Sequence, residues 1–235
     1  MPLKLALKQG GIEMEATIWV EGTGDQKFLA DVIKTWFNIT FDIKGNGKIK
    51  TYVHPLENPR FQIIQLDGID NLFSDKIKSL FKTNRDNQIK NIVLVDTDGD
   101  LKERQSKIEQ SRKILDEHFP CFLIPNDQKT GNLETLLENI INPENQPLFD
   151  CWQKYTACLE VIPHPDAEKN ALTLPDNKAK IYAYLEALLG TSDAEKQKIK
   201  EEYRDYTNQN HWDLNHAYLE PIKTFLNKHL IVQPA

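Results

Sequence analysis

The sequence predicts an α/β protein with a largely parallel sheet and a helical C-terminal extension. Short apolar runs alternate with segments of helical periodicity over residues 1–130. The clearest runs are 17–20 and 91–95, which are rich in β-branched residues and are followed by acidic residues and glycine. Runs of this length and composition are typical of strands buried on both faces, and such strands belong to parallel sheets. Their alternation with helices predicts right-handed strand–helix–strand units.

The N-terminal elements follow from alternation and periodicity. Residues 3–20 are expected to form a hairpin, because 3–8 alternate weakly between apolar and polar and Gly10-Gly11 provides a turn. A helix is predicted over 26–37, where the apolar residues share one stripe. A second hairpin or an irregular excursion is expected at 41–53, around Gly45-Asn46-Gly47. Lys48 follows that turn without the spacing of a phosphate-binding loop, which favours a plain turn.

Alternation continues in the middle of the chain. An apolar run at 61–66 predicts a strand, and Asp67-Gly68 ends it before a helix near 71–81. The strand ending at Asp96 is followed by a polar helix at about 103–118 and a short strand at 121–124. Strand and helix thus alternate repeatedly, as in a Rossmann-like sheet.

The pattern changes after Gly131, where apolar residues take helical spacing. Further helices are predicted at 148–159, 178–189 and 214–230. Pro221 is expected to kink or interrupt the last one. The chain is therefore divided into an α/β domain, 1–130, and a helical region, 131–235, that packs on the sheet.

Composition indicates a folded cytoplasmic protein. No run approaches the length of a membrane span, and the N-terminus has no long apolar segment of a secretory signal. The net charge of −6 argues against nonspecific coating of nucleic acid, which depends on dense Lys and Arg contacts. Cys121, Cys151 and Cys158 form no Cys-x-x-Cys pair. Cys151 and Cys158 would share a helix face, where core packing is favoured.

Acidic residues follow the two clearest strands. Glu21 ends the first, and Asp96 and Asp98 follow the second. Side chains two residues apart in a strand point to the same face, so Asp96 and Asp98 would point the same way if the strand runs through them. Ligands of parallel sheets lie beyond the strand carboxyl ends. Clustered carboxylates there suit Mg²⁺ or Mn²⁺, although turn chemistry alone would also explain each segment.

These residues resemble the Toprim domain, a metal-binding module of topoisomerases, primases and overcoming-lysogenization-defect nucleases. In that family a Glu follows the first strand and Asp-x-Asp follows a later one. The wider pattern, over about residues 15–230, resembles a bacterial Toprim-like family of uncharacterised function. Its further segments appear as Val20-Glu21-Gly22, Pro125-Asn126-Asp127, Gly131-Asn132-Leu133-Glu134 and Asn177-Lys178-Ala179-Lys180. The resemblance implies a Toprim-like Rossmannoid sheet.

Nuclease members of that family carry further carboxylates and a lysine. The additional acids here are Asp25, Asp127 and Glu134, and the lysines are Lys129, Lys178 and Lys180. Pro125-Asn126-Asp127 is equally good turn and helix-cap chemistry. Lys178 and Lys180 would lie on nearly opposite sides of a helix, so at most one can easily face a shared groove. Lys129 precedes a predicted helix start that would attract phosphate.

The function expected from these residues is Mg²⁺-dependent hydrolysis of phosphodiester bonds. Asp96 and Asp98 would hold the metal, and Glu21 would complete its shell or act as the catalytic acid/base. A second metal would need Glu21, Asp25 and Asp127. The alternatives are a non-catalytic module that binds a nucleotide, a nucleic acid or a partner protein, and a phage-defence effector that requires a partner ATPase. No membrane partner is expected.

Overall fold

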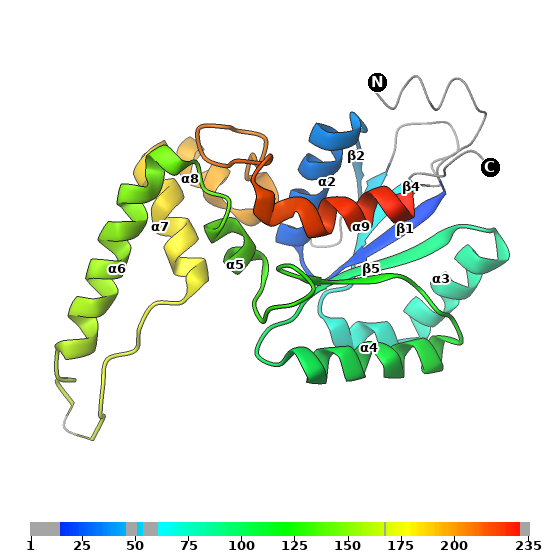
Figure 1. Cartoon of the computed structure of the whole chain (residues 1–235), viewed down its shortest axis with the longest axis horizontal. Coiled ribbons are helices and arrows are strands. Elements are labelled where there is room, and N and C mark those ends of the chain that lie inside the picture. The colour runs from blue at the N-terminus through cyan, green and yellow to red at the C-terminus, as the bar shows by residue number, and fades with distance from the viewer. Residues whose placement is uncertain (1–14, 46–50, 54–60, 167, 231–235) are drawn as a thin grey trace.

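The computed structural model describes residues 15–45, 51–53, 61–166 and 168–230. A six-stranded sheet with the order β2-β3-β4-β1-β5-β6 forms its centre (Figure 1). Strands β4, β1, β5 and β6 are parallel, and β2 and β3 extend the sheet as antiparallel strands. The strands are β1 Ala16–Val20, β2 Asp42–Lys44, β3 Thr51–Val53, β4 Phe61–Gln65, β5 Lys90–Asp96 and β6 Cys121–Ile124.

The register brings the acidic strand ends to one edge of the sheet. Val20 pairs with Leu94 of β5 and with Gln65 of β4. All five residues of β1 are buried, as expected for a central strand with helices on both faces. Glu21 and Asp96 therefore leave neighbouring parallel strands at the same carboxyl edge, where ligands of such sheets bind.

Helices cover both faces of the sheet, and each face has its own core. Ile18 and Val20 point into the core beneath α2 Thr23–Phe37, which also contains residues of α5, α7 and α9. Trp19 points into the opposite core, beneath α3 and α4. The alternation of neighbouring residues between the two cores follows from the pleat of an extended chain. The other helices on these faces are α3 Asp75–Asp86, α4 Leu101–Leu115, α5 Leu133–Glu138 and α9 Glu220–Leu230. α7 Asn177–Leu189 packs against α5 instead of the sheet.

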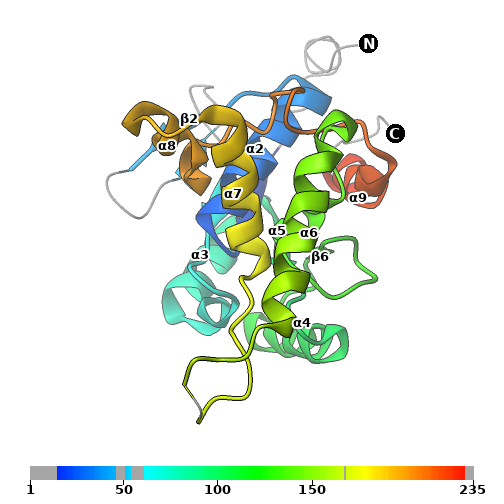
Figure 2. The same ribbon diagram turned by 90° about the vertical axis from the view of Figure 1, so that its left-hand side faces the viewer.

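An arm of two helices extends from one end of the molecule (Figures 1 and 2). It consists of α6 Gln146–Val161 and α7, which lie side by side. In α6 only Phe149 is fully buried. The remaining short elements are η1 Ile69–Phe73, η2 Pro143–Asn145, α8 Asp193–Ile199, η3 Glu201–Tyr203 and η4 Ala217–Leu219.

The predicted α/β class, the mostly parallel sheet and the C-terminal helices are confirmed. The predicted strand over 121–124 is β6 itself, and the 41–53 excursion is the antiparallel pair β2 and β3. The hairpin expected at 3–20 lies outside the described residues except for its end, and so does the turn at 46–48. Among the described helices, none is long and apolar enough to cross a membrane.

The bounds of two predicted helices and the packing expected for two cysteines were wrong. The segment 214–230 is not one helix kinked at Pro221: α9 starts at Glu220, so Pro221 lies in its first turn, where a missing N–H costs no intrahelical bond. The helix near 71–81 is divided at Ser74, whose side chain caps α3. Cys151 and Cys158 are exposed on α6 instead of being packed in the core. The reason is that α6 packs mainly against α7, so most of its surface stays exposed.

Candidate functional site

The loop between β1 and α2 places two acidic side chains at the carboxyl edge of the sheet. Glu21 follows β1, and Asp25 lies in the first turn of α2. Gly22 takes the N-cap position in an extended conformation and donates its backbone N–H to Asp25 Oδ2 at 2.8 Å. That bond fixes the carboxylate of Asp25, which is buried and interacts electrostatically with Glu21. The turn therefore gathers both acids instead of exposing them to solvent.

The end of β5 adds Asp96 and Asp98, but not by simple strand alternation. β5 ends at Asp96, and Asp98 has a left-handed backbone with φ of 54°. The Thr97 hydroxyl donates to the Ile124 carbonyl at 2.7 Å, which anchors the turn to the end of β6. Asp96 Oδ1 is buried and accepts no hydrogen bond, whereas the side chain of Asp98 is 55% exposed. The strand does not run through both aspartates, so the condition under which they would point the same way is not met, although their charges still interact.

Arg104 of α4 lies against these acids from the other face of the sheet. Its guanidinium donates from Nη2 to Asp98 Oδ2, and Nη1 lies 3.7 Å from Glu21 Oε2. The second distance is too long for a hydrogen bond, so Nη1 and Glu21 Oε2 are both buried without one. The Arg104 side chain is only 9% exposed. A buried guanidinium is thus bonded on one side only.

The helical region after residue 131 supplies two further acids. Glu134 lies in the first turn of α5, and Glu201 lies in η3. A Cβ added at Gly24 would lie 3.2 Å from Leu133 Cδ2 and 3.5 Å from Glu201 Oε2. A side chain at Gly24 would therefore crowd Leu133 at the start of α5, which packs closely on the loop that carries Asp25. We call Glu21, Asp25, Asp96, Asp98, Glu134 and Glu201 the carboxylate cluster.

Two cations accompany the acids of the helical region. Lys178 Nζ lies 2.5 Å from Glu201 Oε1, at a position where the lysine side chain is 54% exposed. Arg204 is almost fully buried, donates from Nε to the Ile199 carbonyl at 2.8 Å and stacks on the Tyr182 ring. Its two Nη atoms form no hydrogen bond, and its charge acts on Glu134. Positive charge thus reaches the carboxylate cluster from both sides of the sheet.

Burial and mutual repulsion raise the pKa of several members of the carboxylate cluster. Burial raises the pKa of Asp25 to about 7, with the charges of Glu21, Glu134 and Glu201 acting in the same direction. The pKa of Asp96 lies well above its ordinary value because the carboxyl is buried beside Asp25 and Glu21. Burial also raises the pKa of Glu21 against the opposing charge of Arg104. The pKa of Glu134 is raised by burial and by Glu201. Ionising all of these groups together is therefore costly without a cation.

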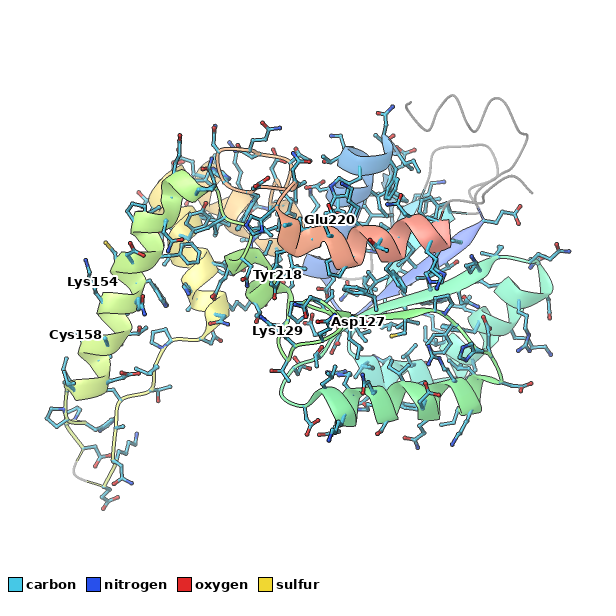
Figure 3. All side chains as sticks on the ribbon, viewed as in Figure 1. Asp127, Lys129, Lys154, Cys158, Tyr218 and Glu220 are labelled. Atoms are coloured by element: carbon cyan, nitrogen blue, oxygen red, sulfur yellow. The ribbon has the colours of Figure 1, made fainter. Side chains whose placement is uncertain are left out.

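The structure does not bring every predicted residue to this cluster. Asp127 Oδ1 accepts the backbone N–H of Leu123 at 3.0 Å and so closes the turn after β6 (Figure 3). Lys129 lies in the same turn, where its backbone N–H donates to Asn126 Oδ1. These contacts are the turn chemistry that Pro125-Asn126-Asp127 also predicted. Asp127 is thus held by its own strand instead of joining the cluster.

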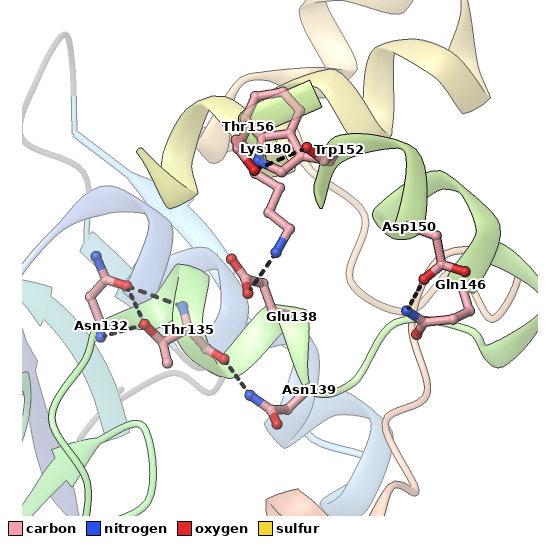
Figure 4. A network of polar contacts seen from close by, with 9 residues as sticks. All are labelled: Asn132, Thr135, Glu138, Asn139, Gln146, Asp150, Trp152, Thr156 and Lys180. Carbon is pink, nitrogen blue, oxygen red and sulfur yellow. Dashed lines mark hydrogen bonds and ion pairs between the residues drawn. The ribbon is translucent and has the colours of Figure 1, made fainter. Parts of the chain in front are cut away.

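The two lysines of α7 diverge, as their spacing predicted. Lys178 pairs with Glu201 of the carboxylate cluster. Lys180 instead pairs with Glu138 at 3.0 Å (Figure 4). Its ammonium group also lies over the Phe149 ring. The start of α5 is closed by Asn132, whose side chain accepts the Thr135 N–H at 3.1 Å. With Glu134 in that first turn as well, the short α5 gives no support to the expected phosphate site at its N-terminus.

The donor set of the carboxylate cluster fits a hard divalent cation. Within the described ranges, no three acidic, histidine or cysteine side chains are arranged as a ready-made metal site. The buried oxygens Glu21 Oε2 and Asp96 Oδ1 nevertheless accept no hydrogen bond. The acidic side chains that act on Asp96 are all carboxylates, so a cation bound there would have oxygen ligands. Mg²⁺ and Mn²⁺ prefer such ligands. Glu21, Asp25 and Asp96, which are close enough for their charges to interact, are the residues that could hold one.

Comparison with known proteins places the chain in a family. Residues 15–230 match the family model described as "Protein of unknown function (DUF3226)". Because the match spans most of the chain, the protein belongs to that family. Searches of curated proteins and of solved structures found no match. The match spans the same part of the chain as the described fold. The family has no described function, so the chemistry must be inferred from the carboxylate cluster.

Sequence reasoning named Lys178 but missed the two arginines, Arg104 and Arg204, and one acid, Glu201. Arg104 had a usable signal, because it occupies the buried stripe of α4 that continues through Ile108, Ser111 and Leu115. A charged residue in such a stripe needs a buried partner. Glu201 and Arg204 lie in and just after a short 3-10 helix, where no periodicity distinguishes them from surface residues. Their role depends on how this segment packs against α2.

Proposed function

We propose that this protein is a Mg²⁺- or Mn²⁺-dependent phosphodiester hydrolase. The observation that supports it best is the burial of Glu21 Oε2 and Asp96 Oδ1 without hydrogen bonds, beside the buried Asp25. Buried carboxylates that repel one another are expensive to maintain unless a cation neutralises them. Their position at the carboxyl edge of a parallel sheet is where α/β enzymes bind ligands. The resemblance to the Toprim domain agrees with this site.

Each group then has a role that its surroundings suit. Glu21, Asp25 and Asp96 would hold the cation, and Asp98 would join them on release from Arg104. A bound Mg²⁺ would polarise a phosphoryl oxygen and lower the pKa of water. Burial raises the pKa of Glu21, which makes its carboxylate a stronger proton acceptor than an exposed glutamate and so suits a catalytic acid/base. Lys178, which is more exposed than Arg104, would contact a substrate phosphate.

The test combines cation binding with cleavage. Calorimetry with Mn²⁺ and cleavage of plasmid DNA, single-stranded DNA and RNA would compare wild type with Glu21→Gln and Asp96→Asn. Both variants keep side-chain shape and remove charge, so we expect weaker Mn²⁺ binding and loss of cleavage. The matched control is Asp127→Asn, which removes a nearby charge outside the carboxylate cluster. Cleavage that persists in EDTA, or Mn²⁺ affinity that Asp96→Asn leaves unchanged, would contradict the proposal.

A non-catalytic binding module is the second candidate. It is favoured by the salt bridge of Arg104 with Asp98, which satisfies one predicted ligand without a metal. On this alternative the protein binds a nucleotide, a nucleic acid end or a partner such as an ATPase, without turnover. Mn²⁺ binding without cleavage of any of the three substrates, alone or with such a partner, would favour it over the hydrolase.

A further inference from the structure

Arg104 lies between two predicted metal ligands, Asp98 and Glu21, but forms a hydrogen bond with only one of them. One nitrogen, Nη2, is bonded to Asp98, whereas Nη1 has no hydrogen bond and lies 3.7 Å from Glu21 Oε2. A guanidinium presents a rigid planar fork that suits two acceptors at once. The second nitrogen of this buried guanidinium is therefore unused, and the Glu21 oxygen that it faces, Oε2, also has no hydrogen bond.

The pairing also explains why these acids do not form a ready-made metal site. Asp98 is drawn toward α4 by Arg104, and its backbone N–H is fixed to the Gly131 carbonyl at 2.8 Å. Asp96, only two residues earlier, keeps a buried oxygen without a donor. A cation bound by Asp96 and Asp98 together would have to compete with the guanidinium for Asp98.

We propose that Arg104 is a positioning residue that acts as the internal counter-ion of the carboxylate cluster and is displaced from Asp98 and Glu21 when a divalent cation binds. This inference rests on the proposed function in one respect, that a divalent cation binds the cluster. It goes further because it assigns a role to a residue outside the predicted metal ligands. Arg104 sets the affinity for the cation, since every binding event must break its contacts.

The test is Mn²⁺ calorimetry on the full chain at pH 8 with wild type, Arg104→Gln and Arg104→Lys. Removing a buried positive charge beside the cation should strengthen Mn²⁺ binding by at least about tenfold. Lysine keeps the charge but cannot present a two-pronged fork, so Arg104→Lys should strengthen binding less, by about threefold. Thermal denaturation in EDTA should show both variants to be less stable than wild type, because Asp98 and Glu21 lose their partner.

The matched control is Arg112→Gln, on the same helix. Arg112 pairs with Glu109 and donates to the Phe119 carbonyl, away from the carboxylate cluster, so its removal should leave Mn²⁺ affinity unchanged. Unchanged or weaker affinity in both Arg104 variants, with wild type still binding Mn²⁺, would overturn the counter-ion role alone. If neither wild type nor the variants bind Mn²⁺, the counter-ion role and the proposed function fail together. Binding that appears only in Arg104→Gln would support the inference.

Discussion

Replacing Asp25 with asparagine should stabilise the metal-free protein at alkaline pH. Asp25 is 6% exposed, and burial together with neighbouring acids raises the pKa of its carboxyl to about 7. Asparagine has nearly the same shape and keeps an oxygen that can accept the Gly22 N–H. The substitution therefore removes an unfavourable charge and retains the hydrogen bond that starts α2.

The size of the effect follows from the pKa. A raised pKa means that the folded protein holds the proton more tightly than the unfolded chain does. The penalty for ionising Asp25 is therefore absent below its ordinary value of 3.8 and grows until the pH passes about 7. That difference corresponds to about 4 kcal/mol at most at pH 8, and sharing of protons with neighbouring acids reduces it. We expect Asp25→Asn to gain about 1–3 kcal/mol there.

Urea denaturation in EDTA at pH 5 and pH 8 would measure the free energy of unfolding. The gain should be larger at pH 8 than at pH 5, where wild-type Asp25 is mostly protonated. Asp31→Asn is the matched control on the same helix. Asp31 is also buried but is paired with Lys27 at 2.5 Å and accepts the Tyr206 N–H at 2.9 Å, so its replacement should destabilise. If Asp25→Asn destabilises the protein equally at both pH values, the electrostatic reasoning is refuted.

Three further outcomes are expected. Mg²⁺ should raise the melting temperature more at pH 8 than at pH 5.5, because ligands must be deprotonated; an equal rise in a fluorescence melt would argue against carboxylate binding. Asn91→Ala should cost about 2–4 kcal/mol in urea, because Asn91 Oδ1 accepts from Trp19 at 2.9 Å and from Asn84 at 2.7 Å inside a buried core; a cost below 1 kcal/mol would mean that water replaces it. Gly131→Ala should cost about 1–3 kcal/mol, because φ is 145° and the new Cβ would lie 2.7 Å from Thr135 Oγ1. It should also weaken Mn²⁺ binding, and calorimetry that gives the wild-type affinity would contradict this expectation.

The fold was predictable because its information is local. The runs ending at Val20 and Asp96 are buried strands whatever surrounds them, and parallel pairing follows from the helices between them. The prediction for Pro221 was wrong because the apolar spacing of 214–230 does not show whether the proline lies in the first turn of a helix or in its interior. Only the position of the helix start, which depends on the preceding η4, distinguishes the two cases.

The candidate site was predictable only in the part that follows strand ends. Glu21 and Asp96 meet because their strands pair in parallel register, which a strand assignment already implies. Asp127 also follows a strand, yet its carboxylate is taken up by the Leu123 N–H, and sequence cannot distinguish a turn-closing aspartate from a ligand. Glu201 depends on tertiary packing of a short segment, for which no pattern in the sequence gives a signal.

The helical region forms part of the site as well as covering the sheet. The acids from β1, α2 and β5 have Arg104 as their cation, and its charge acts on Glu21 and Asp98. Lys178 and Arg204 come from the helical region and act on Glu134 and Glu201 instead. Gly24 lies where the two groups of acids come together, and an added side chain there would crowd Leu133. The helical region therefore brings both acids, Glu134 and Glu201, and cations, Lys178 and Arg204, to the carboxylate cluster. The acids of the cluster outnumber these cations and Arg104, and a divalent cation would neutralise the remaining negative charge.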